Sequence, residues 1–557
     1  MNPAIMRFAL GRDPAISVPS ELQPRFKNQP PPMFRISAQK FLITLCALSS
    51  AYSAPADWPQ WRGPARNGSL DSGPALADSW GAEGPRILWD SELIPSDDDG
   101  GHGSPVLADG RVYLSVVWHS DEPSETRTIT DLIMRVRLGH QNASPLGKEL
   151  IEKIESARES LAPTLRGAKL EEFIEKFIQE NLDRKKRELF GSWISSRFKK
   201  GKLAIPLGDY DKLKARVEKP FASQSEFEAW VNAQGFADHV KQAVLDAVPA
   251  SKRVAEDTVI CLDANSGKTI WITRAPGEPK GRNCSSTPCV AGGLVFAMGS
   301  THLYAVNTET GKLHWSQPLS SKAPGSSPLV VDGVVFAQAG KLCAFDAGTG
   351  KPLWEQPSVT GSNASPTLWQ DASTKLIVCN SRNELTGVDP SSGKIVWSIP
   401  GGGDSTPAIQ GNLAAVLSSK DSIGFAGYQI SATEAKQLWN HPTDARRSQS
   451  SPILSQGHAY LFEDNEHRCI HLASGKVAWT QKISSSITSP VMADAKIFIV
   501  TNNGNTLSML RATPEERVEL GKATIRALWV PSPSIGDGKL FVRHRQGVRC
   551  YDLSKAK

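Results

Sequence analysis

A nine-residue pattern that recurs along the chain limits the possible folds more than any other feature. Four copies run from Asp or Asn through Gly-Lys to Trp: DANSGKTIW (263–271), NTETGKLHW (307–315), DAGTGKPLW (346–354) and DPSSGKIVW (389–397). A shortened copy, LASGKVAW, ends at Trp479, and a copy without the glycine, ATEAKQLW, ends at Trp439. The pattern predicts a β-hairpin in which Asp or Asn opens the turn and glycine takes a positive φ.

In this interpretation the tryptophan lies on the outgoing strand and fills the gap between neighbouring sheets. The residues assigned to this structural motif are Gly267, Trp271, Gly311, Trp315, Gly350, Trp354, Gly393, Trp397, Trp439, Gly475 and Trp479.

A second mark, a Ser or Thr followed by Pro, accompanies the hairpins. Its prolines are Pro105, Pro288, Pro328, Pro366, Pro407, Pro452, Pro490 and Pro533. After the first interval they are spaced 38 to 45 residues apart. A period near 40 with several short strands per unit is typical of a β-propeller, in which each repeat forms one four-stranded blade. The eight marks predict an all-β, eight-bladed propeller.

The N-terminal 56 residues have a different character. Residues 1–32 are rich in proline and are interpreted as a non-native or disordered extension. Residues 33–56 combine a basic start, the apolar run FLITLCALSS and small residues, which predicts a secretory signal peptide with translation starting at Met33. We therefore expect an exported protein, in the periplasm or outside the cell, without a transmembrane segment. Cys46 raises the alternative of a lipoprotein, but Leu45 before it is larger than a lipobox requires.

Composition excludes some functions and leaves others open. The net charge of +6 is spread over 557 residues, and no element carries the basic stripe of a nucleic-acid binder. The eight cysteines form no Cys-x-x-Cys pair, so buried free thiols are expected. Cys261, Cys343, Cys469 and Cys550 fall at similar places in the third strand of their repeats. A disulfide between Cys284 and Cys289 is the alternative for those two.

The segment DWPQWRGPARNG (57–68) opens the mature chain and predicts, with residues up to 83, a strap on the surface of the domain. Together with the DxxxGKxxW repeats it resembles the exported pyrroloquinoline-quinone (PQQ)-like propeller proteins. The same repeat occurs in quinoprotein alcohol dehydrogenases and in the scaffold lipoprotein of the outer-membrane β-barrel assembly machinery. This resemblance covers residues 57–118 and 255–557. It implies the fold but not an activity, because the repeat residues build blades rather than sites.

The two ends of the repeat region are predicted to complete one blade together. Residues 84–118 supply the strand GPRILWD (84–90) and the first half of blade one, and residues 256–557 supply the remaining blades. The last repeat stops after three strands at Leu553. The N-terminal strand would therefore close the ring and leave no free sheet edge.

Residues 119–255 interrupt blade one between its second and third strands. Apolar residues recur there at helical spacing, for example from Leu150 to Leu161 and from Leu170 to Ile178, which predicts an inserted helical subdomain. Ser225 with Glu228 fits a capping box. We interpret the insertion as a cover or a partner-docking arm on the face where propellers commonly bind ligands, and a merely decorative insertion is the alternative.

The residues just before each Ser-Pro or Thr-Pro are predicted to ring the mouth of the central channel. They are His102, Arg282, Asn283, Asn363, Asp404, Arg447, Gln449 and Trp529. Facing loops would add Arg382, Asn383, Glu384, Asp464, Glu466, His467 and Asn503. Such a ring could hold an anionic or aromatic small molecule, although a hydrated polar funnel is the alternative. Asp404 is the only carboxylate in the inner ring, too few for a hard-cation site and a general base.

These observations favour a non-catalytic binding or scaffold protein of the cell envelope, whose partner is an envelope protein or a small molecule. The chain is expected to be a monomer. No catalytic or metal-binding residues are assigned. The resemblance to quinoproteins gives the alternative: a PQQ-dependent oxidoreductase that uses PQQ with calcium at the channel mouth. That family adds an adjacent Cys pair, and no two cysteines are adjacent here. A glycan-binding propeller is a third hypothesis.

Overall fold

The computed structural model describes residues 57–555 apart from 82, 95–99, 163, 280–283, 444–449, 464, 484–488 and 529. The predicted extension (1–32) and signal peptide (33–56) lie outside the described residues.

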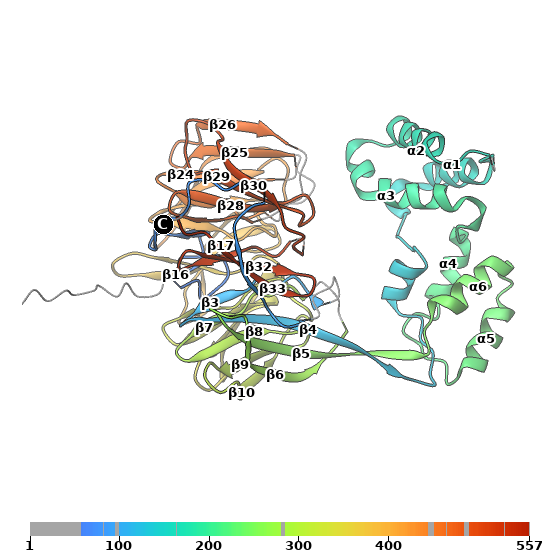
Figure 1. Cartoon of the computed structure of the whole chain (residues 1–557), viewed down its shortest axis with the longest axis horizontal. Coiled ribbons are helices and arrows are strands. Elements are labelled where there is room, and N and C mark those ends of the chain that lie inside the picture. Colours follow the sequence, from blue (N-terminus) through green and yellow to red (C-terminus); the bar gives the residue numbers. More distant parts are fainter. Residues whose placement is uncertain are drawn as a thin grey trace, which may run out of the picture. The chain divides into compact units, whose positions relative to one another are not determined.

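Eight four-stranded antiparallel sheets follow one another along the chain, as predicted (Figure 1). Blades 1 to 4 contain β3 (Val106–Ala108), β4 (Arg111–Pro123), β5 (Ser251–Asp263) and β6 (Thr269–Gly277); β7 (Cys289–Ala291), β8 (Leu294–Met298), β9 (His302–Asn307) and β10 (Leu313–Pro318); β11 (Leu329–Val331), β12 (Val334–Gln338), β13 (Gly340–Asp346) and β14 (Pro352–Gly361); and β15 (Thr367–Gln370), β16 (Lys375–Asn380), β17 (Glu384–Val388) and β18 (Ile395–Pro400).

Blades 5 to 8 repeat the same order. They contain β19 (Ala408–Gln410), β20 (Leu413–Leu417), β21 (Phe425–Ile430) and β22 (Ala435–His441); β23 (Ile453–Ser455), β24 (His458–Phe462), β25 (Glu466–His471) and β26 (Val477–Lys482); β27 (Val491–Ala493), β28 (Lys496–Thr501), β29 (Thr506–Arg511) and β30 (Glu519–Thr524); and β31 (Ser534–Gly536), β32 (Lys539–His544), β33 (Gly547–Asp552) and β2 (Ile87–Asp90).

The ring closes as the sequence predicts. Strand β2 pairs antiparallel with β33, so that Trp89 lies opposite Cys550 and Asp90 opposite Arg549. Arg549 also donates to the Asp90 carboxylate, with 2.5 Å between Nε and Oδ1. The last blade is therefore assembled from both ends of the repeat region, so β33 is not left as an unpaired sheet edge.

The repeated hairpin adopts the predicted turn, and its structure gives two reasons for the glycine. In the third blade the Asp346 carboxylate accepts the Thr349 N–H at 2.7 Å, and Gly350 has a φ of 73°. A Cβ on Gly350 would also lie 2.6 Å from Cδ2 of Trp315 in the preceding blade. The glycine therefore provides both a left-handed backbone and room for the neighbouring indole.

Six tryptophans of the outer strands join their blade to the next one. The indole N–H groups donate to backbone oxygens of the following hairpin at 2.6 to 3.1 Å, in the pairs Trp89–Ala264, Trp271–Thr308, Trp315–Ala347, Trp354–Pro390, Trp439–Leu472 and Trp479–Thr513. Trp397 faces a hairpin that lacks the glycine, and among the described residues its indole N–H has no hydrogen-bond partner. The hairpin of blade 7 also lacks the glycine, but it still accepts the Trp479 N–H through Thr513 O, so the glycine is not required for the link.

Each outer strand carries a β-bulge just before its tryptophan or at the equivalent place. The register shifts between Leu313 and Trp315 in β10, and at the corresponding points of the other outer strands. A bulge bends and twists an edge strand, so it hinders pairing with the edge of another molecule.

The segment before β2 differs from its prediction. Strand β1 (Ser69–Leu70) pairs in parallel with β27 as a fifth strand of blade 7. Trp58 forms a bridge with Leu107 of β3, and Trp58, Arg62 and Arg66 are each at most 2% exposed. The prediction of a surface strap is therefore wrong for residues 57–70, because this segment runs along the inner strands and not over the outside of the domain.

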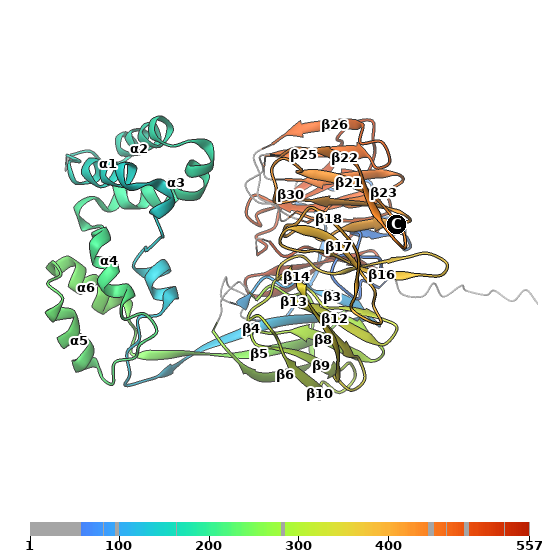
Figure 2. The same ribbon diagram turned by 180° about the vertical axis from the view of Figure 1, so that it is seen from behind.

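The insertion leaves blade 1 between β4 and β5, at the predicted point, and both strands extend for 13 residues as a two-stranded ribbon (Figure 2). Its helices are α1 (Lys148–Glu159), α2 (Ala168–Asn181), α3 (Arg184–Lys200), α4 (Leu207–Lys214), α5 (Gln224–Ala233) and α6 (Asp238–Ala247), with short turns η2 (Ile133–Arg137), η3 (Ser144–Leu146) and η4 (Gly201–Leu203). Helices α1–α3 and α4–α6 bury two separate apolar cores, and Leu207 packs against both.

A helix cap and an ion pair between helices stabilise the insertion. The Ser223 hydroxyl, not that of Ser225, accepts the Glu226 N–H at the start of α5, while Glu226 accepts the Ala222 N–H at 2.7 Å. The capping box predicted from Ser225 and Glu228 is therefore wrong by two residues. In the other half, Arg197 of α3 donates to Glu155 of α1 at 2.6 and 2.8 Å, which ties the two helices together.

The cysteine prediction is confirmed for the described residues. Cys261, Cys284, Cys289, Cys343, Cys379, Cys469 and Cys550 are all free and buried. The alternative of a Cys284–Cys289 disulfide is therefore wrong. Burial raises the pKa of the Cys261 thiol to about 12, which keeps it protonated and unreactive.

Candidate functional site

The Ser or Thr before each proline links neighbouring blades at the start of the inner strands. The backbone N–H of one such residue donates to the side-chain hydroxyl of its counterpart in the next blade, at 2.9 to 3.2 Å. Seven links of this kind are Ser104–Thr287, Thr287–Ser327, Ser327–Ser365, Ser365–Thr406, Thr406–Ser451, Ser451–Ser489 and Ser532–Ser104. The proline marks the repeat in the sequence, and the hydroxyl before it holds the ring together.

Two arginines from the N-terminal segment reach the centre of this ring. Arg66 donates from Nη1 to Pro366 O at 2.8 Å and from Nη2 to Pro328 O. Arg62 donates from Nη1 to Ser451 O at 3.0 Å and from Nη2 to Pro452 O. The guanidinium groups thus bridge blades 3, 4 and 6. Sequence reasoning missed them, because nothing in a single RGPAR copy distinguishes a buried cation from an exposed one.

Three of the eight predicted mouth residues can be placed. Asn363 is exposed, and its Nδ2 donates to Asp404 Oδ1 at 3.0 Å, which joins the entries to blades 4 and 5. His102 is buried, and its backbone N–H donates to the Ser285 hydroxyl at 3.1 Å. The structure therefore brings Asn363 and Asp404 together. Arg282, Asn283, Arg447 and Trp529 lie outside the described residues.

The facing-loop residues divide into two groups. Arg382, Asn383, Glu384 and Asn503 are exposed. His467 is buried against Phe462, with 4.8 Å between ring centroids. Burial, and to a lesser degree the nearby Arg517, lowers the pKa of His467 to about 3. A neutral, buried imidazole is a packing residue rather than a ligand-binding cation, so the predicted role of His467 is not supported. Asp464 lies outside the described residues, as does Gln449, the eighth of the predicted mouth residues.

A buried carboxylate that the sequence did not reveal lies between blades 1 and 2. Asp257 accepts the Ser300 N–H at 2.7 Å and the Tyr304 hydroxyl at 2.9 Å. Burial raises the pKa of Asp257, and these hydrogen bonds partly oppose that shift. A Cβ on Gly299 would lie 2.3 Å from Asp257 Oδ2, so the loop glycine is shaped around the carboxylate. The contacts make Asp257 a link between two blades.

A second polar cluster lies beside an open cleft of about 820 Å³, which residues of blades 5 and 6 line. The buried Glu463 accepts the Thr443 hydroxyl at 2.8 Å and pairs with Arg468 at 3.2 Å. Arg468 also pairs with Glu466, whose neighbour across the strands is Lys482. The two carboxylates fix Arg468 within the protein, so this cation is already neutralised.

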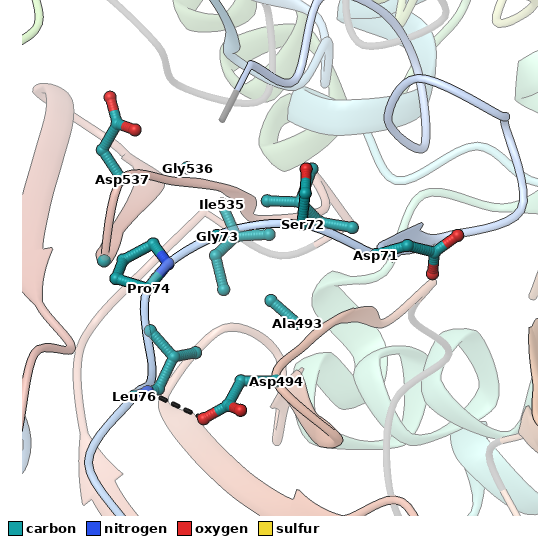
Figure 3. A pocket seen from close by; sticks show the side chains of 12 residues that line it. Asp71, Ser72, Gly73, Pro74, Leu76, Ala493, Asp494, Ile535, Gly536 and Asp537 are labelled. Atoms are coloured by element: carbon teal, nitrogen blue, oxygen red, sulfur yellow. Dashed lines mark hydrogen bonds between the residues drawn. The ribbon is translucent and has the colours of Figure 1, made fainter. Parts of the chain in front are cut away.

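A smaller cavity of about 110 Å³ lies beside the N-terminal segment, between the turns of blades 7 and 8 (Figure 3). Asp71, Asp494 and Asp537 line it, but Figure 3 shows their carboxylates pointing in different directions. Asp494 accepts the Leu76 N–H at 2.7 Å and pairs with Lys496 at the same distance. These carboxylates hold the chain in place and do not converge on a common point.

PQQ with calcium can be tested against these contacts. A calcium site needs several converging oxygen ligands. Asp404 is bonded to Asn363, and within the described ranges no group of three or more His, Cys, Asp or Glu side chains could hold a metal ion. The nearby guanidinium groups of Arg62 and Arg66 are directed to carbonyl oxygens. The described residues do not fit this cofactor, and we derive no chemistry through it.

The helices between residues 57 and 555 that the structure describes include none long and apolar enough to cross a membrane.

Several known proteins are similar to this chain. The outer membrane protein assembly factor BamB of Salmonella typhimurium is 25% identical over 319 residues, covering 45% of this chain and 80% of its own length. The Escherichia coli protein of that name is 27% identical over 267 residues, covering 45% and 67%. The solved structure of BamB from Moraxella catarrhalis is 15% identical, covers 54% of this chain and 93% of its own, and gives a TM-score of 0.44.

The profile of one protein family matches residues 255–400 and 342–557, which together make up more than half of the chain. Its description is outer membrane protein assembly factor BamB, and its repeat is the PQQ-like propeller blade. The matched range contains the hairpins and the Ser-Pro or Thr-Pro marks of blades 2 to 8. The chain belongs to the family of PQQ-like repeat β-propellers of the BamB and quinoprotein dehydrogenase type.

Proposed function

We propose that the protein is a non-catalytic binding or scaffold protein of the cell envelope, which it reaches by export. One observation carries the proposal: among the described residues, three charged groups at the ring centre and mouth are bonded within the protein. Arg62 and Arg66 are bonded to blade carbonyls, and Asp404 is bonded to Asn363. A catalytic propeller would instead present such groups to a substrate or cofactor. Membership of a family described by an envelope assembly factor supports the envelope assignment.

In this proposal the helical insertion is the partner-docking arm. It extends from blade 1 on the β4–β5 ribbon and has its own two apolar cores, so its surface can vary without disturbing the blades. Its surface exposes three large apolar side chains: Val136 is 69% exposed, Leu189 51% and Leu203 68%. Exposed apolar groups are candidates for contact with another protein.

A capture experiment tests the arm. We expect a crosslinked envelope partner of the full chain to be lost when Leu203→Glu or Leu189→Glu is introduced. Ile395→Glu is the matched control, because Ile395 is an exposed apolar residue of an outer blade strand, 36% exposed. Equal capture by all three variants would contradict a docking role for the insertion.

A titration tests the non-catalytic assignment. We expect no saturable PQQ binding in the presence of calcium when tryptophan fluorescence and calorimetry are followed. Saturable binding that weakens in Asp404→Ala, but not in Asp421→Ala, would overturn the proposal in favour of the oxidoreductase alternative. Asp421 is a suitable control because it lies in the cleft between blades 5 and 6, away from the Asn363–Asp404 pair.

A further inference from the structure

We propose that the centre of the propeller is a binding site for guanidinium groups, and that residues 57–70, here called the docked segment, occupy it as an intramolecular ligand. The inference is independent of the envelope function proposed above. It assigns a chemical class of ligand, a planar cation with several N–H donors, to a place where the repeat itself supplies only acceptors.

The acceptors come from the Ser-Pro dipeptides of the blades. Five carbonyl oxygens receive the two guanidinium groups: those of Ser327, Pro328, Pro366, Ser451 and Pro452. Proline has no N–H, so these positions present carbonyl oxygens without a backbone donor from the proline. Because the dipeptide recurs in every blade, the start of the inner strands forms a crown of carbonyl oxygens around the axis.

The two cations are held by dipoles and not by opposite charges. Besides the carbonyls, Arg66 donates from Nε to the amide oxygen of Gln60 at 2.9 Å. None of the acceptors recorded for Arg62 or Arg66 among the described residues is a carboxylate. Burial lowers the pKa of Arg62 to about 9 and that of Arg66 to about 10, so both remain protonated at neutral pH. The crown must therefore compensate the loss of hydration through hydrogen bonds alone.

The backbone of the docked segment adopts left-handed conformations at both arginines. Arg62 has a φ of 63° and Arg66 a φ of 54°, in the left-handed region that residues with a Cβ rarely adopt. Such conformations cost on the order of 1–3 kcal/mol each and persist where surrounding contacts determine them. Gly68 is also adapted to the site, because a Cβ there would lie 2.6 Å from Arg62 Nη2.

The docked segment contacts blades that do not contact one another. Pro59 O accepts the Val290 N–H of blade 2, Trp61 Nε1 donates to the Thr406 hydroxyl of blade 5, and Gly68 O accepts the Met492 N–H of blade 7. With the arginines, it joins blades 1 to 7 through one short piece of chain. In a repeat protein each repeat contacts only its neighbours, so distant repeats stabilise one another little. A central ligand that bonds to several blades supplies this missing connection.

Chemical rescue tests the site in the full-length protein. In Arg66→Ala, added methylguanidinium is expected to raise the midpoint of thermal unfolding saturably, by about 1–3 °C, because it binds the vacated carbonyls of the folded state. Methylammonium at the same concentration should not, because it lacks the planar fork. Wild type and Arg86→Ala are controls: in wild type the crown is occupied, and Arg86 is an exposed residue paired with Asp552. An equal response of all proteins, or none in Arg66→Ala, would overturn the proposal.

Amide hydrogen exchange of the wild-type chain gives a second measurement if Arg66→Ala does not fold. The Gly68 N–H donates to Arg62 O at 3.0 Å, and the Met492 N–H donates to Gly68 O at 2.8 Å. If the segment is a docked ligand, both amides exchange as slowly as those of the inner strands. Exchange of Gly68 as fast as an unprotected turn amide would show that the segment is not held and would overturn the proposal.

Discussion

The propeller is held together in two places, at its rim and at its centre, by different chemistry. At the rim, a tryptophan of one blade packs on the hairpin glycine of the next and donates to its backbone, and this contact is repeated around the ring. At the centre, two arginines from one short segment bond to carbonyls of several blades. The rim contact is local and redundant, whereas the central contact occurs once. We therefore expect a lost central arginine to cost more than a lost rim contact.

The largest expected effect tests the central contact directly. Arg66→Met keeps most of the side-chain volume but leaves carbonyls of Ser327, Pro328 and Pro366 without their donor. We expect a loss of about 3–5 kcal/mol in the free energy of unfolding, because several charge-assisted hydrogen bonds in a buried site disappear together. Urea denaturation followed by fluorescence measures it. If the loss is smaller than that of the rim variants described below, the central contact stabilises the protein less than the rim contacts, contrary to our expectation.

A rim glycine is expected to come second. Gly350→Ala places a methyl group 2.6 Å from the Trp315 ring on a backbone with a φ of 73°, so it combines steric overlap with strain. We expect a loss of about 2–3 kcal/mol. Gly110→Ala is the matched control, because Gly110 has a φ of 70° and nothing lies within 4 Å of its added Cβ. It should lose only about 1 kcal/mol. Equal losses would show that the indole moves away at no cost.

The indole hydrogen bond can be isolated by comparing two tryptophans. Trp354→Phe removes the donor to Pro390 O at 2.9 Å, whereas Trp397→Phe removes an N–H that has no partner among the described residues. Both changes lose similar ring area, so the difference between them should be about 1 kcal/mol, with Trp354→Phe the more destabilising. Thermal unfolding of the pair measures this difference. A larger loss in Trp397→Phe would mean that the hydrogen bond does not stabilise the junction.

The smallest effect concerns pH. His467 is buried with a pKa lowered to about 3, so the unfolded chain binds a proton near pH 6.5 that the folded chain rejects. Stability therefore falls as pH falls below 6.5, by about 0.8 kcal/mol from this residue between pH 7.5 and 6. This part of the change should be missing in His467→Gln and kept in His471→Gln, an exposed residue of the same strand, while the part from His544, whose pKa burial lowers to about 4, remains in both. Stability measurements at the two pH values that give the same dependence in His467→Gln would exclude this residue as the cause.

Some features of this molecule can be predicted from sequence patterns and others cannot. A turn glycine and an apolar strand impose their geometry locally, so their repetition predicted eight blades, the closing strand at Trp89 and the interruption between β4 and β5. The mouth residues were harder, because a position before Ser-Pro gives the location along a strand but not the partner. Asn363 and Asp404 meet only because consecutive blades bring their entries together. His467 falls in a predicted facing loop, yet its side chain is buried.

The capping box shows the same limit on a smaller scale. Both Ser223 and Ser225 have a glutamate three residues later, so the sequence offers two alternatives of equal form. The backbone at Ser223 is extended and its hydroxyl accepts the Glu226 N–H, which selects the first. Where two local patterns are equivalent, the packing of the whole helix decides between them.

The sequence by itself determined the repeating parts of this protein: the hairpins, the number of blades, the splice of the two ends and the helical insertion. Each follows from interactions between residues close in the chain or from a period that can be counted. Only the tertiary structure decided that Arg62 and Arg66 are buried and bonded to the blades. Their carbonyl acceptors in the blades lie between 261 and 390 residues away, so no local rule distinguishes them from arginines on a surface strap. A buried cation is defined by what surrounds it, and that is fixed only when the ring closes.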